Sequence, residues 1–236
     1  MTTRHFGIFF LLALLFCSLP LPAQQSSSSA APPEAPQPQQ KKSKRVFYII
    51  PAYDAQDLRS DPYHSLTVEQ KFNIFVDNTF DVYTLFRAAA SAGIGQATGN
   101  PHYGQGSRAY AKRFGAALAD TSIHDFATSF MMPSLFHQDP RYFRLGPEGG
   151  SKGHRVWYAI SRVFVTRNDS GRDAPNYSYL LGSLGAVTLS NTYYPKRDQT
   201  VDYTLKRFGY NLGFQAGNYF LKEFWAGISK KVFRTK

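Results

Sequence analysis

Cysteine is nearly absent from this chain, because Cys17 is the only one among 236 residues. Residues 1–23 have the features of a secretory signal peptide: basic Arg4, a short apolar run, and Ala23 ahead of a polar stretch. Cleavage after Ala23 removes the cysteine, so the mature chain has no disulfide, no thiol nucleophile and no cysteine ligand for a metal. We therefore expect an exported protein, in the periplasm or at the outer membrane, that is stabilised by packing.

Long apolar runs are also lacking. The run at residues 6–15 is shorter than the roughly 20 residues that span a bilayer, so we expect cleavage of the signal and not a retained anchor. Residues 24–45 are rich in Ser, Pro and Gln and have little apolar surface to offset the entropy of ordering, which predicts a disordered linker. Its basic end, residues 41–45, suits a solvated tether or contact with an anionic envelope surface.

Acidic residues are few, at 16 against 27 lysines and arginines. Five basic residues and one acidic residue precede position 46, so residues 46–236 keep 22 basic and 15 acidic residues, a net charge of +7. This excess favours an anionic partner such as lipid head groups, lipopolysaccharide or a cell-wall polymer. Export argues against a nucleic-acid partner. Charge alone does not indicate an oligomeric state.

Helical spacing of apolar residues dominates residues 46–236, which are enough for a single domain. A capping box at Thr67 and Gln70 begins the first helix, Asn176 is an N-cap, and Pro133 is expected to end a helix. The predicted helices cover residues 67–99, 107–132, 153–167, 176–194 and 200–231, after a possible short strand at 47–51. We predict a mainly α, compact multi-helix domain.

One stretch also fits a strand. Apolar residues alternate strictly at residues 208–217, which alone is typical of a strand in an outer-membrane β-barrel, the alternative fold. A barrel requires many regularly spaced alternating segments, and the rest of the chain lacks them. Helical spacing returns at residues 218–232, so a helix is favoured.

Small residues recur at four-residue spacing in three of these helices. An interior glycine costs about 1 kcal/mol relative to alanine, and close approach of two helix backbones can compensate for it. Packing within the domain is favoured over membrane insertion, because the uncharged span 208–221 is too short to cross a bilayer. The predicted packing residues are Gly115, Ala119, Gly182, Gly209, Gly213 and Gly217.

Polar residues cluster most densely at 137–144. As a catalytic site, His137 is a candidate base, Asp139 a candidate for orienting it, and Arg141 and Arg144 candidates for holding an anion. The structural alternative is that Asp139 caps a helix with Pro140 at its first position, which is the favoured interpretation for these two residues.

A second candidate group combines Asp120 and His124, which are four residues apart and therefore share a helix face. With His137 they would supply the ligands of a two-histidine, one-carboxylate metal site. No compact HExxH-like signature accompanies them, so we predict no metal and no cofactor, and a capping or surface role for this pair.

The pairs Gly153-His154 and Ser161-Arg162 resemble fragments of the membrane-associated phosphatidic-acid phosphatases. Ser151-Lys152 replaces the Pro-Ser of that family, the gap to Ser-Arg is much shorter, and the downstream histidine with its aspartate is absent. The structural alternative places His154 and Arg155 at the exposed start of a helix. A phosphatase-like envelope hydrolase that uses His, Arg and Asp residues within 120–162 is therefore the alternative function, and a non-catalytic role is favoured.

Segments spread over most of residues 46–236 resemble an uncharacterised family of exported bacterial envelope proteins. They include Gly104-Gln105-Gly106, Pro133-Ser134-Leu135, Gln138-Asp139-Pro140-Arg141-Tyr142-Phe143-Arg144, Asp169-Ser170-Gly171, Tyr193-Tyr194-Pro195 and Leu221-Lys222-Glu223-Phe224-Trp225. The resemblance implies a helix-rich exported domain and carries no activity, cofactor or site residue. The sequence thus predicts an envelope protein with a structural or binding role.

Overall fold

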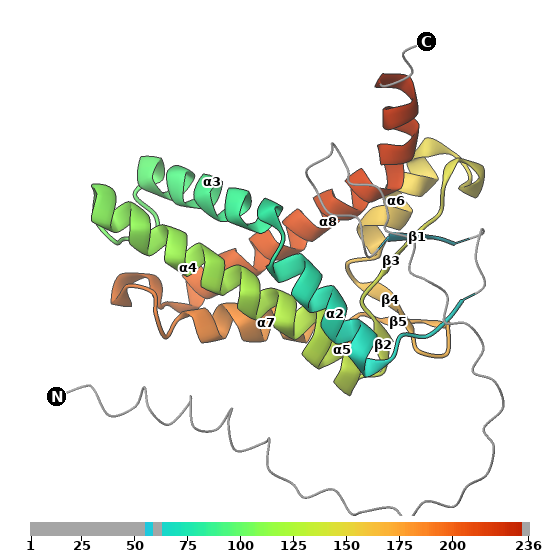
Figure 1. Ribbon diagram of the computed structural model, residues 1–236, viewed down its shortest axis with the longest axis horizontal. Coiled ribbons are helices and arrows are strands. Elements are labelled where there is room, and N and C mark those ends of the chain that lie inside the picture. The colour runs from blue at the N-terminus through green and yellow to red at the C-terminus, as the bar shows by residue number, and fades with distance from the viewer. Residues whose placement is uncertain (1–54, 59–62, 233–236) are drawn as a thin grey trace, which may run out of the picture. The chain divides into compact units, whose positions relative to one another are not determined.

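The computed structural model describes residues 55–58 and 63–232, with side chains described as far as 225, and it is mainly helical, as the sequence predicts (Figure 1). By its contacts the chain divides into Met1–Lys41 and Lys42–Lys236, and every described residue belongs to the second unit. The signal, the linker predicted at 24–45 and the strand expected at 47–51 all lie outside the described residues.

The elements follow one another as helices interrupted by short strands. The helices are α2 (Val68–Thr79), α3 (Val82–Thr98), α4 (Ser107–Asp125), the π-helix η2 (Phe126–Met131), α5 (Met132–Leu135), the 3-10 helix η3 (Pro147–Gly149), α6 (Lys152–Ser161), α7 (Tyr177–Ser190), the 3-10 helix η4 (Lys196–Asp198) and α8 (Val201–Val232). The strands are β1 (Ala55–Asp57), β2 (Gln138–Asp139), β3 (Tyr142–Arg144), β4 (Val165–Asn168) and β5 (Asp173–Pro175).

The first predicted helix begins where the sequence indicates but is two helices. Thr67 and Gln70 form the capping box, each side chain accepting from the other's backbone N–H, at 3.2 and 2.9 Å. The expected single helix at 67–99 is wrong because Asp81 caps α3, its carboxylate accepting from the Tyr83 amide at 2.7 Å. An aspartate that bonds the backbone ahead of it favours a new helix start over continuation.

The second predicted helix runs past its expected end. After α4 the chain continues through the π-helix and α5 to Leu135, so Pro133 does not stop it. Pro133 is the second residue of α5, so it lies where the π-helix passes into the α-helix.

The third predicted helix is shorter than expected, since α6 ends at Ser161 and residues 165–168 are strand β4. β4 lies between β2 and β5 in an antiparallel sheet, and β1 pairs in parallel with β3. Asp139 belongs to β2, so its predicted role as a helix N-cap is also wrong. β-branched Val165 and Thr166 suit a strand, and the partner that completes the sheet follows only at β5.

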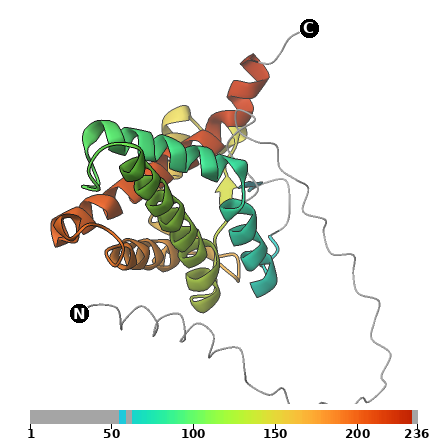
Figure 2. The same ribbon diagram turned by 60° about the vertical axis from the view of Figure 1, so that its left-hand side comes forward.

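The longest helices of the described domain are α3, α4, α7 and α8 (Figures 1 and 2). α3 packs along α4, α4 packs on α7, and α7 packs on the π-helix. α8 runs from the end of α7 towards α6 and contacts both (Figure 1). The stretch 208–217, with its strand-like alternation, lies within α8 and is helical.

Close helix packing occurs at Gly182, where an added Cβ would lie 3.1 Å from the Thr128 side chain and 3.2 Å from the Ala127 backbone. Ala119 is partly buried. The other four predicted packing glycines have open space: a Cβ at Gly115, Gly209, Gly213 or Gly217 would meet nothing within 4 Å. Close packing of helix backbones therefore does not explain these four.

A buried carboxylate attaches α8 to the small strands and to α6. Glu223 accepts from the Tyr142 hydroxyl at 2.9 Å and from Nε of Arg155 at 2.8 Å. It also accepts from the amides of Leu145 and Gly146, at 2.9 and 3.0 Å. Arg155 is buried, which corrects its expected place on an exposed helix start. Its partner is 68 residues away, and no local pattern reveals it.

Replacing this carboxylate tests its importance. Glu223→Gln leaves the Arg155 charge buried without its counter-charge, so we expect a loss of about 3–5 kcal/mol in the free energy of unfolding, measured with urea. Asp202→Asn is the matched control, because it breaks only the exposed pair with Lys206. The control should not change stability measurably. Equal stability of the two variants would contradict a central role for Glu223.

Candidate functional site

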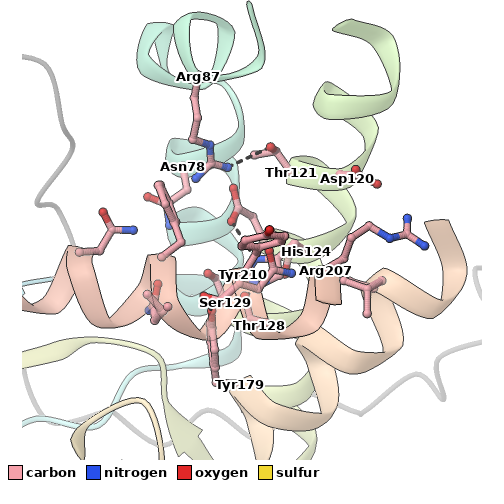
Figure 3. Close-up of a pocket in the computed structure, with 18 of the residues that line it drawn as sticks. Asn78, Arg87, Asp120, Thr121, His124, Thr128, Ser129, Tyr179, Arg207 and Tyr210 are labelled. Carbon is pink, nitrogen blue, oxygen red and sulfur yellow. Dashed lines mark hydrogen bonds and ion pairs between the residues drawn. The ribbon is translucent and has the colours of Figure 1, made fainter. Parts of the chain in front are cut away.

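A cavity of about 710 Å³ lies between α2, α3, α4, the π-helix, α7 and α8. Its size falls in the range of roughly 300–1,000 Å³ that is usual for small-molecule sites. Figure 3 shows side chains from these helices pointing into it, with Arg87 and Asn78 on one side and Asp120 and Arg207 on the other. The cavity is therefore the candidate functional site of the described domain.

Two glycines of α8 help to keep the cavity open. Gly209 and Gly213 both line it, and neither has an atom within 4 Å of the position where a Cβ would stand. Each glycine makes the helical state of α8 less favourable by about 1 kcal/mol than an alanine would. Tyr210 and Phe214, their neighbours in the chain, are exposed large side chains that also line the cavity. Larger residues at the glycines would reduce its volume.

The opposite wall comes from α3 and α4, which approach closely. Ala88, Ala92 and Gly95 are buried on α3. A Cβ on Gly95 would lie 2.4 Å from the Asn100 carbonyl oxygen and 3.0 Å from the Arg113 side chain, so only glycine fits. This packing fixes the face of α3 that carries Arg87 toward the cavity.

The cavity wall carries polar side chains that the chain itself does not use. Within the described residues, five of them make no hydrogen bond through their side-chain polar atoms: Asn78, Ser91, Ser129, Gln215 and Asn218. Amides and hydroxyls both donate and accept. Their unused capacity suits water or a polar ligand with many hydroxyl groups.

Arg87 is the one cavity residue on α3 that carries a charge. Its Nη2 donates to the Thr121 hydroxyl at 2.9 Å, and its guanidinium carbon lies 5.3 Å from the centre of the Phe214 ring. Among the described residues no carboxylate lies within ion-pair distance of it. One of its five N–H donors is thus occupied by the chain.

Asp120 lies across the cavity from Arg87 (Figure 3). Its two carboxylate oxygens accept from the hydroxyls of Tyr193 and Tyr194, each at 2.5 Å. Burial raises the pKa of Asp120, and the two hydrogen bonds oppose that rise in part. Arg207 stacks on Tyr194 with its guanidinium carbon 4.2 Å from the ring centre, and it donates to Ser190 at 2.7 Å.

His124 lies one helical turn beyond Asp120. Its Nδ1 is 3.6 Å from the Asp125 carboxylate, and its ring meets Tyr179 edge to face with centres 5.6 Å apart. Its Nε2 is buried and has no hydrogen-bond partner within the described part of the chain. The imidazole therefore has one polar atom that neither protein nor bulk solvent satisfies.

The structure brings together three of the five candidate residues from the sequence. Asp120, His124 and Asp139 line the cavity, whereas His137 and Arg141 do not. The Asp139 carboxylate is engaged elsewhere: it accepts from Nε and Nη2 of Arg141, at 2.9 and 2.6 Å, and from Tyr63 at 3.2 Å. Asp139 and Arg141 form a buried structural pair and not a base with its anion holder.

His137 stands apart, with 84% of its side chain exposed. Its Nδ1 is 3.8 Å from Asp169, whose carboxylate is held by the buried amine of Lys71 at 2.9 Å. No group of three or more His, Cys, Asp or Glu side chains is placed to hold a metal ion in the part of the chain that the structure describes. The hypothetical metal site of Asp120, His124 and His137 is therefore not formed.

Sequence reasoning missed Arg87, Asn78 and the two tyrosines that bind Asp120. A signal for Arg87 was present, because it is the single charged residue of the apolar and small-residue helix α3. A charge in such a segment indicates a specific role for it. Asn78 and the tyrosines belong to polar stretches where nothing distinguishes a wall residue from a surface residue.

Comparisons with known proteins give no match, whether with protein-family models, with characterised proteins or with solved structures. Over the described residues, no helix combines the length and the apolar character needed to cross a membrane.

The raised pKa of Asp120 predicts a specific dependence of stability on pH. Because this pKa is higher in the folded chain than in the unfolded chain, folding takes up a proton between about pH 4 and the folded-state pKa. The free energy of unfolding of the wild type, minus that of Asp120→Asn, should therefore increase as pH falls from 7 to 4.5 in urea titrations.

Asp173→Asn is the control with the opposite sign. A hydrogen bond from Arg162 lowers the pKa of Asp173, so its contribution to stability persists down to about pH 4 and is lost only below that. A wild-type minus Asp120→Asn difference that stayed constant over pH 7 to 4.5 would contradict the raised pKa.

Proposed function

We propose that this chain is an exported binding protein of the cell envelope whose cavity holds a small hydroxylated molecule, a saccharide unit. The observation that carries the proposal is the 710 Å³ cavity with its unused amide and hydroxyl side chains. A sugar presents hydroxyls that each donate and accept, which is what such side chains match. Tyrosine and phenylalanine rings in the wall supply flat apolar surface for the sugar's C–H faces.

The proposed location rests on the sequence. Residues 1–23 have the pattern of a cleaved signal, and residues 46–236 carry a net charge of +7 that suits anionic lipid or cell-wall polymer. A saccharide ligand agrees with that location, since polysaccharides are a major material of the envelope. The resemblance to exported envelope proteins points the same way.

A hydrolase is the second candidate, because Asp120, with its raised pKa, and His124 share one cavity wall. Against it, Tyr193 and Tyr194 occupy both oxygens of Asp120, while His137 and Arg141 lie outside the cavity. Binding therefore fits the geometry better than catalysis.

Filling the cavity tests the binding role. Gly213→Leu puts a side chain into the cavity, and we expect it to abolish binding of glucose, N-acetylglucosamine and glucuronate in calorimetric titrations. Gly217→Leu is the control, because Gly217 lies one turn further along α8, has equally open space and does not line the cavity. Both variants should be as stable as wild type or up to about 1 kcal/mol more stable. If the wild-type protein bound none of the three sugars, the result would contradict the proposal.

Location is tested by fractionation of cells that express the full chain. We expect the protein, without its first 23 residues, in the periplasmic or outer-membrane fraction, with a part that sediments with membranes or cell wall at low salt. Salt should release that part, since attraction between exposed charges is screened within about 10 Å at 0.1 M. Recovery of the uncleaved chain in the cytoplasm would refute export.

A further inference from the structure

The charged side chains of the cavity differ in how far the chain itself satisfies them. Asp139 is paired with Arg141, and the two oxygens of Asp120 accept from Tyr193 and Tyr194. Asp125 faces His124. Arg87 has no carboxylate within ion-pair distance among the described residues, so an anionic group of the ligand can supply its counter-charge.

Arg87 is the residue that the chain leaves most available to such a group. Its guanidinium is held in position on two sides, by Thr121 through one hydrogen bond and by the Phe214 ring. Four of its five N–H donors have no acceptor within the described chain. A planar guanidinium that is fixed in this way matches a carboxylate or phosphate with two parallel hydrogen bonds.

Arg207 differs from Arg87 in this respect. Its two terminal nitrogens donate to Ser190 and to the Asn191 side chain, and its Nε is buried. It stands seven residues before Phe214 on α8, which is about 10 Å along the helix axis. Arg207 therefore braces the Asp120 end of the cavity, and the anion belongs at the Arg87 end.

We infer that the cavity selects an acidic saccharide, whose carboxylate or phosphate binds Arg87 with Asn78 beside it while its hydroxyls meet the polar wall. Figure 3 shows the Arg87 side chain descending from α3 into the cavity toward Asn78 and Thr121. The inference rests on the proposed function and specifies its ligand class. It also accounts for an arginine in a helix that is otherwise made of uncharged residues.

The test compares four probes that separate the sugar from its acid: glucose, glucuronate, glucose 6-phosphate and inorganic phosphate. For the wild-type protein we expect glucuronate or glucose 6-phosphate to bind at least tenfold more tightly than glucose in calorimetric titrations. Arg87→Gln should remove this preference, about 10- to 100-fold in affinity, and leave glucose binding unchanged. Arg87→Lys keeps the positive charge but loses the planar guanidinium with its parallel donors. Its affinity for the acidic sugars should therefore lie between those of the wild type and Arg87→Gln.

Arg108→Gln is the matched control, because it removes the same charge from an exposed position on α4. It should change none of the four affinities, and all variants should keep the wild-type circular dichroism and unfolding midpoint. Equal binding of glucose and glucuronate, or a preference that survives Arg87→Gln, overturns the acidic ligand and leaves saccharide binding in place. Binding of inorganic phosphate alone, lost in Arg87→Gln, supports the anion site and overturns the saccharide.

Discussion

The buried carboxylate of Glu223 is the contact on which the arrangement of α8 depends. It joins α8 to Tyr142 of β3 and to Arg155 of α6, and both of its oxygens are fully hydrogen bonded. A buried ion in this state is tolerated only because every lone pair is satisfied. Near its start α8 is also hydrogen bonded to the C-terminal end of α7, through Thr204 and Arg207, so the helix is held at two places. Its middle is then free to form a wall of the cavity without packing closely on α3.

This arrangement explains why α8 keeps glycines that its stability does not favour. Gly209 and Gly213 have open space beside them, so neither backbone approach nor a left-handed conformation requires glycine there. In a helix held at these two places, the contacts there can compensate for the cost of about 1 kcal/mol at each glycine. The volume that the missing side chains leave is part of the cavity. The binding hypothesis gives a reason for them that packing does not.

The single cysteine cannot form a disulfide within the chain, so distant segments must be joined in other ways. Buried charged pairs do so here. Arg155 and Glu223 are 68 residues apart, and Lys71 and Asp169 are 98 residues apart. Each pair joins a helix to a segment much later in the sequence. Such pairs also demand one specific arrangement, because a misplaced partner leaves a charge buried alone.

Periodicity and capping residues predicted the helical class, the starts of α2 and α7 and the extent of α8, because these depend on neighbours within a few residues. The split at Asp81, the passage through Pro133 and the strand at Val165–Asn168 depended on local alternatives or distant partners that periodicity does not weigh.

The residues of the candidate site were harder to predict than the fold. Asp120 and His124 were found because they share a helix face. The role of Arg87 depends on Phe214, which is 127 positions away and contacts Arg87 only in the folded domain. Polar residues chosen for density along the chain, such as Asp139 and Arg141, satisfied one another instead, since charges that are close in sequence can neutralise each other locally. A charged residue isolated among small ones was the better indicator of a binding site, because it has no local partner and must find one in the fold or in a ligand.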